Sequence, residues 1–340
     1  MLILLHILFG IFSILLFLKK SKSKYENIYF TSIILVLIFT AGLRTPNSDR
    51  DYQNYIDFFN NAPDIIIEPF FIIISVIIKN TIGNSYISLF LIFSFLSLGL
   101  KYFAIKRLTD LWFISAFIYF SYFFILHDLT QIRAGVASSL LFFLVPAIYN
   151  RKPVQFLFIC LLAICFHYSA IIFLFLWFIN KGLGKTILLL LVPVGYFFYF
   201  LNFDLFFSLP FESVNSKLNV YKTLQEYDTD REKINVFNLL FLFKILVYYL
   251  LLIKFNFLKN INKYSSIIIS IYGFSLFSFL FFSKMPIVSF RIYELLGVIE
   301  IIAFTFVYYL FSSRLLPLFF YLITAGIYFY VLLYNMKIIL

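Results

Sequence analysis

The sequence predicts an all-α, polytopic membrane protein with about 10–12 membrane helices, including re-entrant or broken segments. Of its 340 residues, 63% are hydrophobic and 13% are charged, whereas soluble domains carry about 25% charged residues. Apolar stretches close to the length that a membrane helix needs recur along the whole chain. Because backbone groups in lipid have no water to bind, continuous apolar stretches of this kind favour helices.

The candidate membrane segments follow one another with short polar connections. The first segment lacks a basic region and a small-residue cleavage site, so it is interpreted as a retained span and not as a signal peptide. No internal repeat is visible, and the sequence predicts one integral membrane domain over residues 1–340. The candidate segments are residues 2–18, 28–43, 65–79, 86–105, 111–126, 130–149, 153–180, 186–203, 235–255, 264–283, 287–311 and 315–335.

Short loops rich in lysine and arginine predict the orientation, because such loops stay in the cytoplasm. The net charge of +11 is therefore interpreted as topology and not as nucleic-acid binding. Placing the basic loops inside puts the N-terminus and the loops 44–64 and 204–234 outside. The basic loops are 19–24, 101–107, 150–152, 180–185, 254–263 and 312–314, and two further outside turns are 127–133 and 283–286.

Two segments do not fit a simple crossing. Residues 65–79 lie between an outside loop and a span that ends inside, so they are expected to be re-entrant or interfacial. Residues 153–180 begin and end inside, so they are expected to enter the membrane and return. His167 would then mark the bend, where non-helical backbone needs protein or a water-filled cavity around it.

The remaining polar motifs converge on the predicted outside face. They are GLRTPNSDRDYQNYIDFF (42–59) with EPFF (68–71), QIR (131–133), FHYSA (166–170) and SKMPIVSFRIYE (283–294). Arginine forks bind phosphate oxygens bidentately, and a nearby carboxylate or histidine can take a proton from an attacking hydroxyl. A half-buried pocket with these groups would suit glycosyl transfer from a lipid-linked diphosphate sugar.

At these residues the sequence resembles the EpsG-like branch of the Wzy O-antigen and exopolysaccharide polymerases. The similarity covers most of the chain through GLR followed by D-Y-x-x-Y, an E-P pair, I-R-x-x-x-A, F-H-x-S-A and a late arginine. The chain departs from the family where PNSDR replaces a glycine-containing turn, so Asp49 could share or replace the role of Asp51.

The resemblance implies a GT-C-like glycosyltransferase in the bacterial inner membrane with its active face in the periplasm. It implies catalytic roles among Asp51, Glu68 and His167, without selecting the base. It implies polyprenyl-diphosphate-linked oligosaccharide and membrane lipid as partners, and it leaves open a chain-length regulator protein. We expect no metal and no cofactor. The implied substrate-binding residues are Arg44, Asp49, Tyr52, Tyr55, Gln131, Arg133, Lys284, Arg291 and Tyr293, with the two early tyrosines expected to stack on sugar rings.

Other functions stay open at this stage. A lipid-linked oligosaccharide flippase would share the cationic pocket, although such transporters often show an internal repeat. A GT-C-like transferase that uses a lipid-monophosphate sugar donor would need a similar pocket. A membrane O-acyltransferase is a further alternative, but the sequence has no motif that matches it. The D-x-D at residues 49–51 matches a metal-binding pattern of soluble transferases, but alone it is a weak signal.

Three further side chains carry structural expectations. His127 lies in a short predicted turn and is expected to be exposed. Lys244 and Glu300 lie near the middle of their apolar segments. Because unpaired charges at membrane depth are costly, these two are expected to form a structural ion pair.

Overall fold

The computed structural model describes residues 1–18, 26–201 and 234–339, and in these ranges it contains helices and no β-strand. In chain order the first elements are α1 (Leu2–Leu18), α2 (Glu26–Gly42), α3 (Tyr52–Asn61), α4 (Pro69–Thr81), α5 (Tyr86–Leu108), α6 (Trp112–Tyr119), the π-helix η1 (Phe120–Asp128), α7 (Ile132–Tyr149), α8 (Pro153–Phe166) and the 3₁₀ helix η2 (Tyr168–Ile179). They are followed by α9 (Lys185–Phe200), α11 (Leu239–Ile253), α12 (Phe255–Ile261), α13 (Ser265–Phe281), α14 (Pro286–Gly297), α15 (Glu300–Ala303), the 3₁₀ helix η4 (Phe304–Leu310), α16 (Leu315–Tyr330) and the π-helix η5 (Val331–Asn335). The predicted all-α class is confirmed.

The helices have the composition of a polytopic membrane protein. Four of those described are long and apolar enough to cross a membrane alone: α5, Trp112–Thr130, α7 and Leu315–Asn335. A fifth span results if α11 and α12, which meet at a 76° bend, are counted as one. The other apolar helices have 10–17 residues, so the predicted 10–12 membrane helices include segments shorter than a full straight span.

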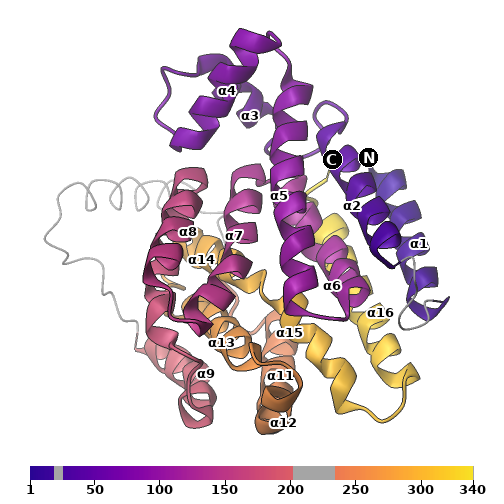
Figure 1. Ribbon diagram of the computed structural model, residues 1–340, viewed down its shortest axis with the longest axis vertical. Coiled ribbons are helices and arrows are strands. Elements are labelled where there is room, and N and C mark those ends of the chain that lie inside the picture. The colour runs from indigo at the N-terminus through magenta and orange to yellow at the C-terminus, as the bar shows by residue number, and fades with distance from the viewer. Residues whose placement is uncertain (19–25, 202–233, 340) are drawn as a thin grey trace, which may run out of the picture.

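The helical body has two distinct ends. The N-terminus and the C-terminal end of the described chain lie near each other at one end of the body (Figure 1). His6 at that end bonds through Nε2 to the hydroxyl of Tyr334 over 2.8 Å. α5 runs away from this end and finishes with Lys106 and Arg107 in its last turn. This arrangement is the one that the predicted topology requires, while the identity of the membrane sides stays a prediction.

The first end carries a small lobe, called here the cap, which consists of α3, α4 and the first turns of α5. Figure 1 shows α3 and α4 beyond the body at the upper end of α5. The cap has its own apolar cluster around Phe59, Phe71, Phe90 and Phe93, all of which are buried. Because α4 lies in the cap and not among the helices of the body, residues 69–81 do not make a simple crossing through the body.

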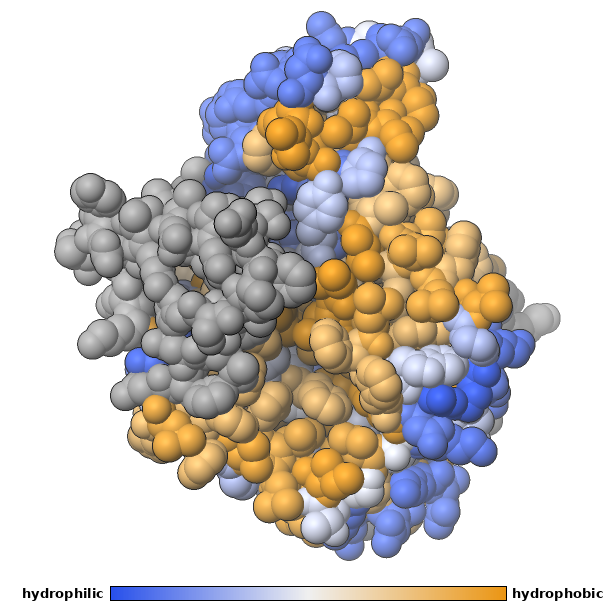
Figure 2. Space-filling view, turned by 90° about the vertical axis from the view of Figure 1, so that its left-hand side faces the viewer, coloured by the Kyte–Doolittle hydropathy of each residue, from blue (hydrophilic) through white to orange (hydrophobic). Residues whose placement is uncertain are grey.

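The surface follows the same division. Figure 2 shows hydrophilic residues on the outer side of the cap and along the opposite lower edge, with hydrophobic residues over the face between them. Loop residues 204–233 and the basic loop 19–24, both named in the predicted topology, lie outside the described residues. The separation of two polar ends by an apolar face is what a protein embedded in a bilayer needs.

Residues 153–180 form the predicted hairpin. α8 and η2 pack against each other, and the backbone between them is extended at His167 (φ −156°, ψ 116°). The ring of Phe156 near the start lies 5.0 Å from the ring of Trp177 near the end. The expectation that His167 marks a bend is therefore confirmed.

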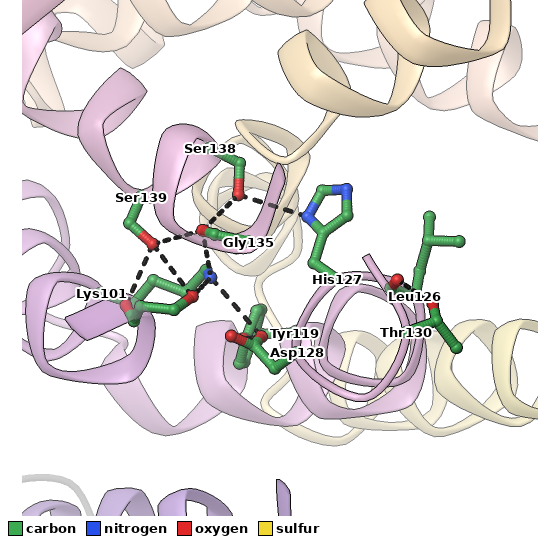
Figure 3. A network of polar contacts seen from close by, with 10 residues as sticks. Lys101, Tyr119, Leu126, His127, Asp128, Thr130, Gly135, Ser138 and Ser139 are labelled. Carbon is green, nitrogen blue, oxygen red and sulfur yellow. Dashed lines mark hydrogen bonds and ion pairs between the residues drawn. The ribbon is translucent and has the colours of Figure 1, made fainter. Parts of the chain in front are cut away.

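The expectation for His127 is wrong. This side chain is fully buried, as is Asp128 beside it, because the end of η1, to which both belong, lies inside the helix bundle. The Lys101 ammonium of α5 lies 3.5 Å from the Asp128 carboxylate and donates to Ser97 Oγ and the Gly135 carbonyl. Figure 3 shows this network between α5, η1 and α7. Lys101, assigned to a cytoplasmic loop by sequence, is thus an interior residue.

The predicted pair of Lys244 and Glu300 is confirmed. Their Nζ and Oε2 atoms are 3.0 Å apart, and both side chains are 1% exposed. The ammonium also lies 4.5 Å from the ring centroid of Tyr122 and 5.0 Å from that of Tyr328. Aromatic faces attract a desolvated cation, so this site joins α11, α15, η1 and α16 around one charge.

We expect that replacing one partner of this pair destabilises the protein more than replacing both. Lys244→Met or Glu300→Gln alone leaves a buried charge without its partner and should lower the free energy of unfolding by about 3–5 kcal/mol. The double variant should lose clearly less than the sum of the two. Unfolding of the purified protein in mixed micelles measures all three values, and strictly additive losses would contradict the coupling.

Candidate active site

Three segments far apart in the chain meet at one carboxylate below the cap. Glu68 precedes the first residue of α4, Arg133 lies in the first turn of α7, and His167 is at the bend between α8 and η2. Arg133 donates from Nη1 to Glu68 Oε2. His167 Nδ1 lies 3.2 Å from Glu68 Oε1, the other oxygen of the same carboxylate. The carboxylate therefore bridges a guanidinium and an imidazole.

The local sequence explains how each group is held. Pro69 starts α4 and fixes the backbone there, which places Glu68 at the end of the cap nearest α8. The backbone N–H of Tyr168 donates to Glu68 Oε1 over 3.4 Å, and its hydroxyl donates to the carbonyl of Ile67 over 3.2 Å. The bend of the hairpin is thus attached to the residues that start α4.

Electrostatics keep Glu68 ionised. Burial by itself raises the pKa of this carboxyl, but the hydrogen bond from His167 and the charge of Arg133 outweigh it and hold its pKa at about 2. An ionised carboxylate only accepts hydrogen bonds, so Nδ1 of His167 is the donor to Glu68 Oε1. In a neutral imidazole with its proton on Nδ1, Nε2 is the nitrogen that can accept a proton.

Arg133 is shielded on its other sides by aromatic rings. Its guanidinium carbon lies 5.4 Å from the ring centroid of Phe58, 5.6 Å from that of Tyr55 and 6.0 Å from that of Phe71. These rings belong to α3 and α4, so the cap packs onto the arginine through cation–π contacts. Arg133 thereby joins the cap to the body.

Arg44 and Asp49 form a second, separate pair. Their closest atoms are 3.4 Å apart, and both side chains have no exposure. Arg44 also donates to the carbonyl of Leu129 and lies 3.8 Å above the ring of Phe90. Burial raises the pKa of Asp49 to about 6, against the lowering effect of Arg44. In this structure, Arg44 connects the loop before α3 to the turn after η1. Its guanidinium is buried, so it is not exposed to bind a phosphate.

The early tyrosines lie inside the cap. Tyr52 stacks on Phe90 with ring centroids 5.2 Å apart, and Tyr55 is 3% exposed. Neither ring offers an open face of the kind expected for sugar stacking. Asp51 is partly exposed, and its backbone N–H donates to Asp49 Oδ1 over 3.0 Å. The structure does not bring Asp51 into contact with Glu68 or His167.

The last predicted motif borders the site through α14, which packs against α7 and η2. Gln131 donates from Nε2 to Glu294 Oε2 over 3.2 Å and so links α14 to the start of α7. Lys284 and Arg291 are exposed and make no ion pair with any residue that the structure describes. Tyr293 is buried against Phe279, with ring centroids 4.7 Å apart.

Sequence reasoning missed several residues around the site. Tyr168 is 52% exposed beside His167, and its place in the FHYSA motif was the available signal. The contact of Glu294 with Gln131 was not predicted. The burial of Lys101 in its separate network was not predicted either, although this residue lies seven residues before the end of α5 and hence well inside an apolar helix. Within the described ranges, no group of three His, Cys, Asp or Glu side chains is arranged to hold a metal ion.

The fold and this cluster define a polytopic membrane protein with a carboxylate, an arginine and a histidine joined below a small lobe at one end. A family model described as the EpsG family matches residues 27–339. The chain belongs to the EpsG family.

The chain is also similar to a curated protein, the amylovoran biosynthesis protein AmsC of Erwinia amylovora, at 24% identity over 210 residues. The similarity covers 56% of this chain and 56% of that protein, so the chain spans about half the length of its relative. No solved structure matches the chain.

We expect the Arg133–Glu68 contact to hold the cap on the body. Arg133→Ala removes the guanidinium and its cation–π contacts, so amide hydrogen exchange should rise in residues 52–81 by about tenfold or more. Arg50→Ala is the matched control, because within the described ranges this exposed arginine bonds to the carbonyls of Met336 and Lys337 and not to the cluster. Equal exchange in the cap of both variants would contradict this role.

We expect the stability of the wild type to fall in acid because of Glu68. The folded-state pKa of Glu68 is depressed to about 2, so its contribution is present above the ordinary value near 4.5 and is lost as the pH falls toward 2. Glu68→Gln should abolish this loss. The raised pKa of Asp49 acts in the opposite direction between about pH 4 and 6 in both proteins, so the difference between their unfolding curves isolates Glu68.

Proposed function

We propose that this protein is a polysaccharide polymerase, a membrane glycosyltransferase that joins polyprenyl-diphosphate-linked oligosaccharide repeat units. Membership of the EpsG family supports a polymerase-type function at the level of the family, and the similarity to a protein of amylovoran biosynthesis agrees with it. The residue-level observation that carries the proposal is the bridge from Arg133 through Glu68 to His167.

In this proposal His167 is the general base. Glu68 holds Nδ1–H of the imidazole, so Nε2 is free to take the proton of an attacking sugar hydroxyl. Arg133 keeps Glu68 ionised and correctly oriented, and does not itself contact the reacting atoms. Glu68 is a poor base, because a carboxyl with a pKa of about 2 has little affinity for a proton near neutral pH.

The exposed cations Lys284 and Arg291 are proposed to bind the diphosphate. As the hydroxyl oxygen of the incoming unit bonds to the anomeric carbon of the growing chain, the bond from that carbon to the diphosphate oxygen breaks. The electron pair leaves with the diphosphate, and the nearby cations stabilise the charge that develops there. Tyr168, with its exposed ring beside His167, is proposed to stack on a sugar of the substrate in place of the buried Tyr52 and Tyr55.

The active face is proposed to be the periplasmic side of the bacterial inner membrane. Basic residues lie at the end of the body opposite to the cap. Lys106 and Arg107 are in the last turn of α5, and Arg314 comes directly before α16. Since basic loops stay in the cytoplasm, this distribution of basic residues supports a position of the cap and the cluster on the outside. A chain-length regulator protein is retained as a proposed partner, and the whole of residues 1–340 is proposed to act as one polymerase domain.

We expect His167→Gln to stop polymerisation without loss of the protein from the membrane. In a strain that depends on this gene for a long O-antigen, the variant should leave single repeat units on lipid A–core, because the base contributes about 10²–10⁴-fold to rate. Gel electrophoresis of the lipopolysaccharide measures the number of repeat units on lipid A–core. His6→Gln is the control, since His6 bonds to Tyr334 away from the cluster.

The same experiment separates the alternatives. Complete loss of polysaccharide on deletion of the gene would indicate a flippase, and full-length polymer from His167→Gln at normal expression would overturn the assignment of the base. For purified protein, Glu68→Gln should lower kcat with little change in KM, because a neutral amide can hold the imidazole in the wrong tautomer.

A further inference from the structure

A cavity lies at the end of the body opposite to the cap. Its volume is about 540 Å³, which is within the range of small-molecule sites. It is formed where α1 ends, where α2, α6 and α16 begin, and where α5 and η4 end. Charged and polar lining residues are Glu26, Asn27, Lys106, Thr109, Asp110 and Arg314. None of these residues belongs to the candidate active site, so the cavity requires a separate explanation.

Its walls have the composition of a membrane interface. Trp112, Tyr308 and Tyr309 contribute aromatic rings, and the buried Leu16 and Leu318 contribute an apolar floor. Tryptophan and tyrosine concentrate at the level of lipid head groups. Beside the cavity, α16 begins with Leu315 and Leu316, which are 58% and 56% exposed. An occupant can therefore place a polar group in the cavity and an apolar chain along the outside of the helix bundle.

The charges in the cavity have both signs. The Lys106 ammonium donates to Asn27 Oδ1 over 2.6 Å and to the hydroxyl of Tyr102 over 3.0 Å, which leaves one of its three N–H groups for a ligand. The exposed Asp110 carboxylate has no hydrogen bond or ion pair with any described residue. A purely anionic ligand would meet the carboxylates of Asp110 and Glu26, and a purely cationic ligand would meet Lys106.

We propose that this cavity binds the head group of a zwitterionic phospholipid with a primary ammonium, namely phosphoethanolamine. The phosphate oxygen accepts from Lys106, and the ammonium donates to Asp110. A primary ammonium fits better than a quaternary one, because only the former has N–H groups for a carboxylate. The occupant is a membrane lipid that binds on the face opposite to the cap, independently of the glycosyl transfer proposed above.

The test uses the full-length protein in nanodiscs and measures which lipids are retained. With equal amounts of phosphatidylethanolamine, phosphatidylcholine and phosphatidylglycerol, native mass spectrometry should show retention of the ethanolamine lipid about tenfold above each of the others. Asp110→Asn should remove the preference for ethanolamine over choline. Lys106→Gln should weaken retention of both lipids, because both share the phosphate contact.

Arg107→Gln is the matched control, because this exposed neighbour of Lys106 does not line the cavity. Thermal unfolding of each variant confirms that it is folded. Soluble phosphoethanolamine and inorganic phosphate, added separately as competitors, distinguish recognition of the whole head group from binding of phosphate alone. Equal retention of the three lipids, a preference for the anionic lipid, or an Arg107→Gln effect as large as that of Lys106→Gln would each overturn the proposal.

Discussion

The structure depends on one constraint, which is that a charge carried into the apolar body must meet an opposite charge there. Removing a charged group from water costs several kcal/mol, and only a close partner with good geometry offsets this cost. Lys101 meets Asp128, and Lys244 meets Glu300. The first pair joins α5 to η1, and the second joins α11 to α15, so each pairing of charges also specifies which helices pack together.

The same constraint operates below the cap, with a different result. Glu68 has two partners on its two carboxylate oxygens, so it is held in one orientation and stays ionised. Among the described residues, His167 has a hydrogen bond only at Nδ1. Arg44 and Asp49 pair with each other in the interior, with no exposure of either side chain. Paired charges of the same types thus serve as a structural tie in one place and as a candidate reaction centre in the other.

Burial explains why the sequence could not distinguish these cases. Arg44 and Arg133 both follow apolar stretches near motifs of the same family, yet one side chain has no exposure and the other is 19% exposed. His127 and His167 both adjoin apolar stretches, but one is enclosed by the bundle and the other lies at a bend beside the cap. Tyr55 and Tyr168 differ in the same way. Solvent access at these positions is determined by neighbouring helices, which no local pattern encodes.

The sequence by itself determined the features that follow from composition and local chemistry. Long apolar runs specified helices, and the basic loops at both ends of residues 153–180 specified a bend at His167. Two isolated charges in apolar segments specified the Lys244–Glu300 pair. Only the tertiary structure decided which carboxylate meets His167, because Asp49, Asp51 and Glu68 are equivalent as residue types and differ in where the cap places them. The reason is physical: partner choice depends on distances between helices, and these are set by packing of the whole bundle.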